Sequence, residues 1–516
     1  MTNMSLLGID IGTTGCKAAA FDEEGRLLAY SYREYNMENV GEQIYELNPR
    51  TVWQKVKEVI YEINSRVKDN PVIALSASVS GDEVVPVDKD RKCLYNVIMS
   101  MDKRGSEELS IWLNGFSRRD IYNKTGLPLH PKYGVNRILW LRNHKPDIYK
   151  KVWKFLTWED FIHLRLGIDD TFCSSSTISR IMLVNIESQT WDEDLLSHVQ
   201  LDKSMFSHIV PPGTMVGRVS RKVCEELGFI KQPFVVSGGF DQSCAALGAG
   251  ITKKGMAMVG TGTMEAIVIY SHEPVLSEEF LNGNYPWNLH VLPKSFNCSA
   301  TNIGGGLLLK WFRDEFCSQE LDEANKEGRN IYDLMLEGLA QKPTGALLLP
   351  HFAGSGPPSK DPDSLGGILG LTTSFSKKNM IQCILEGITY ELRQNIEFIE
   401  KNGNLPVSSI RAVGGGSRSD YWLQLKANIT GKPVEKPLFS EAGCLAAAIL
   451  AGLGVGIYND AAIAADMLIT IDKVFEPDWN IYNDYSEYFQ TYKCMYPSTK
   501  EISHKLKELR KSSIHK

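Results

Sequence analysis

The sequence is poor in the patterns that would place it outside the cell or around a metal cluster. Its 516 residues include ten cysteines. They form no C-x-x-C pair and join no histidines at zinc-binding spacing. These sparse, scattered cysteines predict reduced thiols in a cytoplasmic protein rather than a disulfide framework or a zinc site.

The chain also lacks long hydrophobic runs and a strong charge of either sign. No run of about 18 apolar residues is present to span a membrane, and residues 1–12 lack the basic and apolar regions of a secretory signal. The 56 basic and 62 acidic side chains leave a net charge of −6, which argues against nucleic acid or an anionic membrane as the main partner. The hydrophobic content of 43% and charged content of 23% predict an ordered α/β enzyme of two or three domains.

Two common nucleotide-binding signatures are missing as well. Neither the G-x-G-x-x-G of a dinucleotide fold nor the GxxxxGK[ST] of a Walker loop is found where a strand and a helix would support it. The chain instead opens with three predicted strands, 6–11, 16–21 and 26–32, joined by short turns. An antiparallel meander at this place argues against a dehydrogenase with glycine-rich loops.

The strand pattern at the start of the chain returns about halfway along it. After the meander the pattern predicts, in order, a helix over 49–63, a strand over 72–79, a mostly helical region over 105–233, a strand over 234–236 and a helix over 242–250. Strands over 255–259 and 264–270 then repeat the opening design around a second glycine-rich turn. The repetition predicts two similarly built domains, 1–250 and 251–485, around a cleft, and a polar helical tail over 486–516.

Each half carries a turn rich in glycine and threonine between two predicted strands. Residues 12–15 read Gly-Thr-Thr-Gly, and residues 260–263 read Gly-Thr-Gly-Thr. Backbone N–H groups and hydroxyls in such turns form a concave set of donors for phosphate oxygens, and Asp10 beside the first turn would hold Mg²⁺ through water. An ordinary hairpin explains either turn alone. The pair favours two turns that grip one polyphosphate from both sides of the cleft.

Polar clusters follow several of the predicted strands in the first half. Asp241, just past the strand over 234–236, is either a general base toward a hydroxyl group or the N-cap of the next helix. The clusters 80–83 (Ser-Gly-Asp-Glu) and 102–104 (Asp-Lys-Arg) either bind sugar hydroxyls or form solvated turns.

A third glycine-rich stretch lies late in the chain. Residues 414–417 read Gly-Gly-Gly-Ser and follow a predicted strand over 410–413, as a nucleotide-binding loop would. Ser417 has a second interpretation, as the cap of a helix that begins near Asp420.

Taken in order, these stretches resemble the signatures of the FGGY family of carbohydrate kinases, whose fold is related to actin, the Hsp70 ATPase and hexokinase. The resemblance runs from Gly8 to about Gly456. The matching stretches are the first phosphate turn at 10–14, the acid motif at 238–242, the second turn at 260–263, the second signature at 302–311, the next loop at 349–366 and the adenosine motif at 414–424. Each stretch alone is weak evidence, whereas the whole set in one order is specific.

The resemblance implies two actin-like, ribonuclease H-like domains around a central cleft for ATP and sugar, and ATP-dependent phosphorylation of a sugar hydroxyl. It makes Asp241 the base that takes the hydroxyl proton and places Asp10 and Asp241 beside Mg²⁺. The residues implied for ATP are Gly12, Thr13, Thr14, Gly260, Thr261, Gly262, Gly306, Gly415 and Ser419. The residues implied for the sugar are Ser80, Gly81, Asp82, Asp102, Arg104 and Gln242. A homodimer is the oligomeric state that the resemblance implies.

At the sugar-facing positions the sequence departs from two branches of the family. Residues 79–82 read Val-Ser-Gly-Asp, where xylulokinases carry Gln-Met-His-Gly and glycerol kinases an Arg-Glu pair. Met101 stands where a tryptophan is frequent, and Ser355 and Gly356 replace a Glu-Arg pair. These changes predict a pocket of altered shape. The carboxylate of Asp82 predicts an uncharged polyhydroxylated substrate, because it would repel an acidic sugar.

The favoured activity is phosphorylation of a ketopentose such as xylulose or a related sugar, with glycerol or another polyol as the second choice. An actin-like ATP-binding regulator without catalysis is the alternative from another class. Asp241 argues against that alternative, because a regulator needs no base aimed at a hydroxyl group. Since closed domains would exclude water, ATP hydrolysis without sugar is expected to be slow.

Overall fold

The apolar segments at the start of the chain form the antiparallel meander that their turns predict. In the computed structural model, which describes residues 4–514, β1 (Ser5–Ile11), β2 (Gly15–Phe21) and β3 (Leu27–Glu34) are successive neighbours in one sheet. The remaining strands of this seven-stranded sheet are β6 (Val72–Val79), β12 (Met215–Arg218), β13 (Phe234–Val236) and β14 (Gly239–Phe240). β6 lies parallel to β1, so buried strands occupy the centre of the first lobe.

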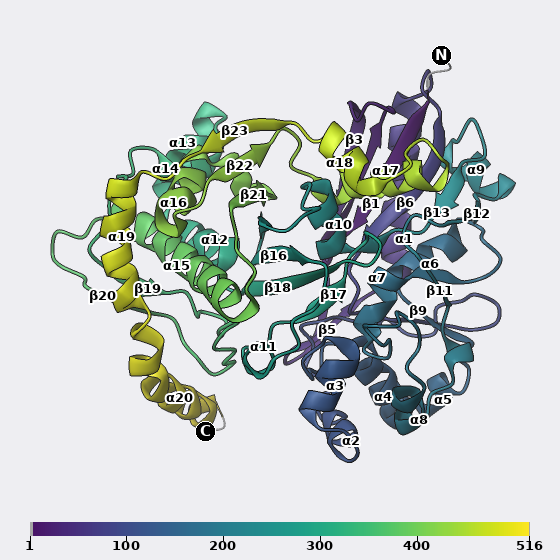
Figure 1. The fold of residues 1–516 in the computed structure, drawn as a ribbon, viewed down its shortest axis with the longest axis horizontal. Coiled ribbons are helices and arrows are strands. Elements are labelled where there is room, and N and C mark those ends of the chain that lie inside the picture. Colours follow the sequence, from purple (N-terminus) through teal and green to yellow (C-terminus); the bar gives the residue numbers. More distant parts are fainter. Residues whose placement is uncertain (1–3, 515–516) are drawn as a thin grey trace.

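The second lobe repeats this design on another seven-stranded sheet (Figure 1). Its strands, in spatial order, are β17 (Trp287–Leu289), β18 (Phe296–Asn302), β16 (Glu265–Ser271), β15 (Met256–Thr261), β21 (Ser409–Val413), β22 (Val434–Pro437) and β23 (Ile471–Phe475). β15, β16 and β18 are antiparallel neighbours and β21 lies parallel to β15, as β6 does to β1. The predicted α/β fold of two equivalent lobes is thereby confirmed.

Helices cover both sheets, and small sheets of two or three short strands accompany them. The helices up to the lobe junction are α1 (Pro49–Arg66), α2 (Leu109–Leu113), α3 (Arg118–Thr125), α4 (Gly134–His144), α5 (Pro146–Tyr149), α6 (Trp158–Arg165), α7 (Ser175–Ile178), α8 (Glu193–Val199), α9 (Arg221–Leu227) and α10 (Asp241–Gly248). Those that follow are α11 (Glu278–Asn282), α12 (Gly305–Phe316), α13 (Ser318–Glu327), α14 (Ile331–Leu336), α15 (Lys377–Gly403), α16 (Asp420–Thr430), α17 (Ala442–Gly454), α18 (Ala461–Leu468), α19 (Trp479–Tyr492) and α20 (Met495–Ile514). The minor strands are β4 (Glu38–Gly41), β5 (Ile44–Leu47), β7 (Val85–Val87), β8 (Val97–Ile98), β9 (Lys154–Leu156), β10 (Phe172–Ser174), β11 (His208–Val210), β19 (Leu347–Leu349) and β20 (Gly367–Leu369).

The two lobes are joined by helices that pack almost backbone to backbone. α17, from the second half of the chain, lies against β1 and β6 of the first sheet and against α10 (Figure 1). A Cβ atom on Gly8 would lie 1.8 Å from the carbonyl oxygen of Cys444, and one on Gly248 would lie 1.9 Å from that of Ala442. Glycine is therefore required at both places. The ion pair between Lys17 Nζ and Glu441 Oε2, at 2.5 Å, also crosses the junction.

Two sequence expectations need correction. The region 105–233 contains the short strands β9 to β12 as well as helices, because segments of three or four residues carry too little periodicity to be recognised. The expected boundary at 486 is wrong, since it divides α19. Tyr485, Phe489 and Tyr492 of α19 are buried in the core of the second lobe, so this helix is no frayed surface tail.

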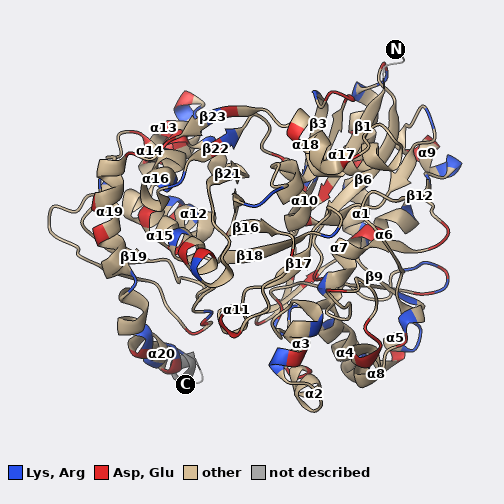
Figure 2. Cartoon of the chain, viewed as in Figure 1, with Lys and Arg blue, Asp and Glu red and all other residues tan. Residues whose placement is uncertain are grey.

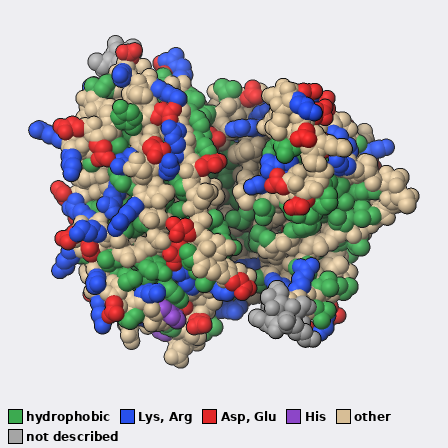
Figure 3. Space-filling model, turned by 180° about the vertical axis from the view of Figure 1, so that it is seen from behind, with side chains coloured by type: hydrophobic (Ala, Val, Ile, Leu, Met, Phe, Trp, Pro, Cys, Tyr) green, Lys and Arg blue, Asp and Glu red, His purple; other side chains and the backbone are tan. Residues whose placement is uncertain are grey.

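The outer surface is mixed in charge, as the composition predicts. Figure 2 shows Lys and Arg interspersed with Asp and Glu over the outer helices of both lobes. Seen from behind, a groove separates the lobes (Figure 3). Within residues 4–514, no helix has the length and apolarity needed to cross a membrane.

Candidate active site

Neighbouring parallel strands end at one edge of the first sheet and bring Asp10 and Asp241 together. Asp10 of β1 is in register with Ser78 of β6, and Ser78 is in register with Gly239 of β14. Ser78 Oγ donates a hydrogen bond of 2.7 Å to Asp10 Oδ1. Asp241 follows Gly239 by two residues and opens α10. Ligands of α/β proteins bind at such carboxyl ends of strands.

Asp241 is a half-buried acid whose Oδ1 atom is buried and lacks a partner among the described residues. Phe240 occupies the N-cap position of α10, so the capping interpretation of Asp241 is wrong. Burial raises the pKa of Asp241 to about 8, and the charges of Asp10, Glu83 and Asp82 contribute. Burial also raises the pKa of Asp10, against the opposing charge of Lys17.

Asp10 and Asp241 are neighbouring half-buried acids, and after burial the charge of Asp10 is the next cause that raises the pKa of Asp241, so the pair fits a divalent cation. Within the described residues, no cluster of three or more His, Cys, Asp or Glu side chains is placed to hold a metal. Mg²⁺ does not need such a cluster, because one or two carboxylates, water and substrate phosphates are its usual ligands. The unpartnered Oδ1 of Asp241 and the carboxylate of Asp10 match that requirement.

Asp82 does not present a free negative charge, contrary to the interpretation of the sequence. Arg180 donates to Asp82 Oδ1 from Nε at 3.0 Å and from Nη2 at 2.6 Å, and Lys132 Nζ lies 3.7 Å from Oδ2. Although burial opposes it, the charges of Arg180 and Lys132 hold the pKa of Asp82 below its ordinary value. The argument that Asp82 would repel an acidic sugar is therefore wrong, because its charge is compensated inside the protein.

The neighbours of Asp82 belong to the same wall. Ser80 Oγ donates to Glu83 Oε2 at 2.5 Å. A Cβ atom on Gly81 would lie 2.7 Å from Arg180 Cγ and 2.9 Å from the Phe240 ring. The missing side chain of Gly81 therefore leaves room for Arg180 to pack against Phe240. The guanidinium of Arg180 stacks on the ring of Phe240, 4.6 Å from its centre. Phe240 directly precedes Asp241 in the chain. Arg180 thus links the predicted residues 80–82 to Phe240, the residue before Asp241. The half-buried Gln242 follows Asp241 in α10.

Asp102 and Arg104 bond to each other and to a neighbouring strand. Arg104 donates to Asp102 Oδ2 at 2.7 Å and to Glu46 Oε1 at 2.7 Å. The backbone N–H of Tyr45 donates to Asp102 Oδ2 at 2.7 Å. Both side chains therefore attach the segment that follows β8 to the strand β5. Their contact with a sugar stays a prediction.

The second lobe contains a cavity of about 350 Å³ lined by the predicted nucleotide residues Thr261, Gly262, Gly306, Gly415 and Ser419. A Cβ atom on Gly306 would lie 2.3 Å from the carbonyl oxygen of Gly262, which keeps the entry of α12 tight against the second turn. The Gly306 N–H donates to that oxygen at 3.0 Å. The turn proper begins after β15, because Gly260 is still paired with Ala266 in the sheet.

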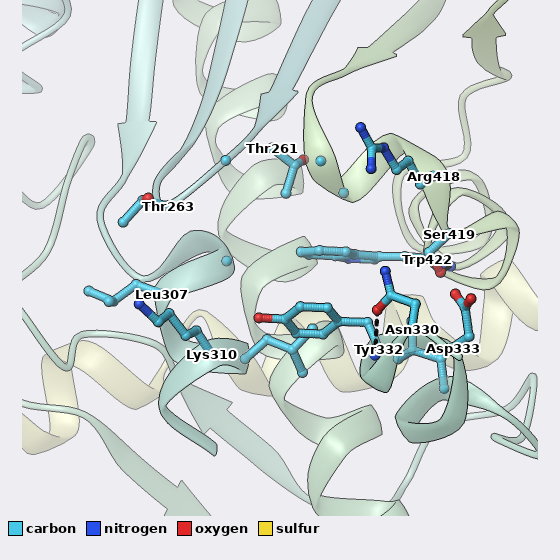
Figure 4. A pocket seen from close by; sticks show the side chains of 16 residues that line it. Thr261, Thr263, Leu307, Lys310, Asn330, Tyr332, Asp333, Arg418, Ser419 and Trp422 are labelled. Atoms are coloured by element: carbon cyan, nitrogen blue, oxygen red, sulfur yellow. Dashed lines mark hydrogen bonds between the residues drawn. The ribbon is translucent and has the colours of Figure 1, made fainter. Parts of the chain in front are cut away.

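Two aromatic rings line opposite sides of this cavity, Trp422 of the predicted adenosine motif and Tyr332, which the sequence did not indicate. Figure 4 shows the ring of Trp422, from α16, and the ring of Tyr332, from α14, on opposite sides of the space. Asn330 accepts a hydrogen bond from Tyr332 N at 2.9 Å. Flat apolar walls of this kind suit a purine ring. Tyr332 lies outside every glycine-rich motif, so no local signal identifies it.

The serine that caps α16 is Ser419. Its Oγ accepts a hydrogen bond from Trp422 N at 3.2 Å. Ser417 instead donates from Oγ to the carbonyl oxygen of Gly414 at 2.7 Å. The capping role expected for Ser417 is therefore wrong, and the cap itself lines the cavity.

The first glycine-rich turn is a tight hairpin at the end of β1. Gly12 N donates to the carbonyl oxygen of Gly15 at 3.0 Å, and Tyr35 Oη donates to that of Gly12 at 2.6 Å. Thr13 and Thr14 form the tip, with Thr14 exposed. The turn is thus held rigid close to Asp10, while its contact with phosphate stays a prediction.

A smaller cavity, here called the interlobe cavity, lies where the two lobes meet. It measures about 170 Å³ and is lined by His130, Lys132 and Tyr133 from the first lobe and by Thr301, Ser355 and Lys360 from the second, among others. Lys132 connects it to Asp82, and through Arg180 to the wall of Asp241. Its size suits a ligand smaller than a drug-sized molecule.

Two lobes of equivalent topology, with a nucleotide-sized cavity in one and a half-buried acid in the other, define a two-lobed phosphotransferase. The chain belongs to the FGGY family of carbohydrate kinases. The model of the family's N-terminal domain matches residues 5–248 and that of its C-terminal domain matches residues 255–455. It is therefore a carbohydrate kinase, an enzyme that transfers a phosphoryl group to an alcohol.

The similar proteins include kinases with different substrates. A xylulose kinase of Bacillus subtilis (strain 168) is 26% identical over 98% of this chain and 99% of its own. A gluconokinase of Bacillus licheniformis is 30% identical over 90% of both chains. Among solved structures, the ligand-bound xylulose kinase from Lactobacillus acidophilus aligns with a TM-score of 0.87 and 22% identity, over 98% of this chain and 100% of that one.

Proposed function

We propose that this kinase transfers the γ-phosphoryl group of ATP to a hydroxyl group of a small polyhydroxylated substrate in the interlobe cavity. Asp241 acts as the general base. The observation that carries this proposal is the unpartnered, buried Oδ1 of Asp241 at the carboxyl edge of the first sheet, beside the wall of that cavity. A pKa of about 8 lies close to the range in which a base works at neutral pH.

The nucleotide is proposed to occupy the cavity of the second lobe. Its purine would lie between Tyr332 and Trp422, and its phosphates against Thr261 and Gly262. Kinases of this family use ATP. The remaining predicted phosphate donors are Gly12, Thr13, Thr14 and Gly260, with Gly306, Gly415 and Ser419 along the nucleotide.

Asp10 and Asp241 are the residues proposed to hold Mg²⁺. When bound, the cation would neutralise charge on the transferring phosphoryl group. Ser78 orients Asp10 through its hydrogen bond. Asp241 accepts the proton of the attacking hydroxyl, and the walls of the two lobes exclude water that would compete with it.

The relatives support two kinds of substrate. The xylulose kinase supports the ketopentose favoured by the sequence, and the gluconokinase supports a sugar acid. Glycerol or another polyol is the further alternative. Because Arg180 compensates Asp82, no charge argument removes the acids from the set to be tested.

The test is ADP release from Mg-ATP across ketoses, aldoses, alditols, glycerol and sugar acids, with Asp241→Asn and Asp90→Asn compared. Asp90 is an exposed acid of the same lobe. Loss of the base should lower kcat by about 10²–10⁴-fold with ATP affinity kept, whereas Asp90→Asn should match the wild type. Activity that survives in Asp241→Asn would mean that another group is the base. ATP binding without transfer to any compound would favour the actin-like regulator.

The predicted homodimer is a separate proposal. Light scattering of the purified chain checks it, and a mass of one chain would contradict it.

A further inference from the structure

Two lysines from different lobes line the interlobe cavity, Lys360 with a neutral hydrogen-bond partner and Lys132 with a carboxylate that it shares with Arg180. Lys360 Nζ donates to Asn284 Oδ1 at 2.7 Å, which is a neutral partner. Lys132 Nζ lies 3.7 Å from Asp82 Oδ2, beyond hydrogen-bond distance, and that carboxylate already binds Arg180. The cavity wall therefore holds more positive than negative charge.

The other acids near this wall do not restore the balance. Burial, and then the charge of Asp82, raises the pKa of Glu83, whose oxygens already accept from Ser80 and from the Ser100 backbone. Asp82 is shared by Arg180 and Lys132, and Lys360 adds a further cation to the same wall, so these cations are not matched one to one by carboxylates.

A further cation lies close behind this wall. The buried guanidinium of Arg137 donates to the carbonyl oxygen of Met99 at 2.9 Å rather than to a carboxylate. Burial lowers the pKa of Arg137 to about 10, which leaves it charged at neutral pH. Burial and the charges of Lys360 and Lys132 lower the pKa of His130 to about 2, so His130 is neutral and able to accept or donate one hydrogen bond.

Lys360 is placed close to other cations and has an unusual backbone conformation. Burial, and then the charges of Lys132 and Arg118, lowers its pKa to about 7. Its backbone φ of +33° lies in the left-handed region, which lysine rarely adopts. Backbone strain of this kind concentrates at functional sites. A bound anion would relieve the repulsion between the two lysines and restore the charge of Lys360.

We infer that the interlobe cavity binds a polyhydroxylated carboxylic acid, whose carboxylate lies between Lys132 and Lys360 while one of its hydroxyl groups reaches Asp241. The inference rests on the proposed function, because it concerns the acceptor of that reaction. The hydroxyl groups of Ser299, Thr301 and Ser355 line the same cavity and suit the middle of the carbon chain. The phosphorylated hydroxyl is then one remote from the carboxylate.

Matched substrate pairs test this assignment directly. Each pair is an aldonate and the alditol of the same configuration, such as D-gluconate with D-glucitol and D-xylonate with xylitol, which differ in the carboxylate. The ketopentose xylulose joins the panel as the neutral sugar. We expect at least one aldonate to exceed its alditol and xylulose by about tenfold or more in kcat/KM, as a charged hydrogen bond allows. Preference for a neutral member throughout the panel would overturn the inference and leave the kinase proposal intact.

The lysines are tested with Lys132→Gln and Lys360→Gln, beside the exposed Lys254→Gln as a matched control. We expect each cavity variant to raise the KM of the preferred aldonate by about tenfold and to lower the ratio of aldonate to alditol kcat/KM by a similar factor, whereas Lys254→Gln should leave that ratio as in the wild type. Equal losses for acid and alditol would show a structural role and overturn the inference. ATP binding and circular dichroism confirm that each variant is folded.

A calorimetric titration separates failure of this inference from failure of the proposed function. Aldonates are titrated into the full-length protein without ATP. Binding to the wild type that weakens in Lys360→Gln supports the inference even if no phosphoryl transfer is found. Absence of aldonate binding, or binding that both lysine variants retain in full, overturns it whatever the kinase assay shows.

Discussion

The buried carboxyl of Asp241 destabilises the ligand-free protein whenever it ionises. Its ordinary pKa is 3.8, and burial raises it to about 8 in the folded state. Between these values the folded protein binds more protons than the unfolded chain, so the free energy of unfolding falls as pH rises through this window. Asp241→Asn removes the ionisable group. Its melting temperature should exceed that of the wild type by more at about pH 9 than at about pH 4, by at least roughly 3 °C.

The measurement is thermal unfolding in buffer with EDTA and without nucleotide. Asp90→Asn, in an exposed turn, should follow the wild type at both pH values. An equal difference in melting temperature at both pH values would show that the carboxyl group of Asp241 does not titrate between them. That result would contradict a pKa raised by burial.

Single residues were predictable where they lie in contiguous motifs, and less so where distant segments meet. Asp10, Asp241 and Gly306 stand in short signatures, so the sequence can single them out as candidates. Arg180 lies 98 residues from Asp82 and has no motif of its own, so the charge of Asp82 was misjudged. Lys132 and Lys360 meet only in the folded chain.

At the scale of elements, α20 holds the loop that carries Lys360. His504 Nε2 lies 2.7 Å from Asp361 Oδ2, and Tyr496 Oη donates to the same oxygen at 3.0 Å. Lys507 Nζ forms an ion pair of 2.9 Å with Asp363 Oδ1. Although burial opposes it, the hydrogen bond from His504 holds the pKa of Asp361 below its ordinary value.

This attachment predicts that Asp361→Asn loosens the acceptor site alone. We expect the KM of the acceptor to rise about three- to tenfold, because Lys360 and Ser355 lose a fixed position, with the KM of ATP unchanged. Steady-state kinetics with each substrate varied in turn checks it. Glu508→Gln, on the exposed side of α20, is the matched control. A parallel rise in both KM values would instead indicate general destabilisation.

The long elements were predictable because each contains several repeats of its hydrophobic pattern. The strand over 72–79 and the helix begun at Pro49 agree with β6 and α1. The buried aromatic side chains of α19, at 485, 489 and 492, also follow helical spacing, and the basic residues beyond them obscured it. Strands of three residues, such as β9 and β10, gain their stability from pairing with distant partners and leave no local pattern.

For the whole molecule, the proposed position of the substrates between two lobes would determine how ATP is protected from water. The cavity proposed for the nucleotide is lined by the second lobe, whereas Asp241 belongs to the first. The lobes are joined by α10 and α17, and a groove runs between them (Figure 3). With ATP and the acceptor placed as proposed, Asp241 and the γ-phosphoryl group would meet across a lobe boundary, and an acceptor in the interlobe cavity would contact both sides of that boundary.

This arrangement predicts that ATP hydrolysis is slow until the acceptor is present. Without it, water reaches the interlobe cavity but makes none of the contacts that position a hydroxyl against Asp241, so the advantage of fixed geometry is lost. We expect ADP release from Mg-ATP alone to be at most about 1% of the rate with the preferred acceptor. A coupled ADP assay on the same enzyme sample measures both rates, with Asp241→Asn as the background. A rate without acceptor close to the full rate would mean that the base activates water directly and that the two lobes do not need the acceptor to form the reactive site.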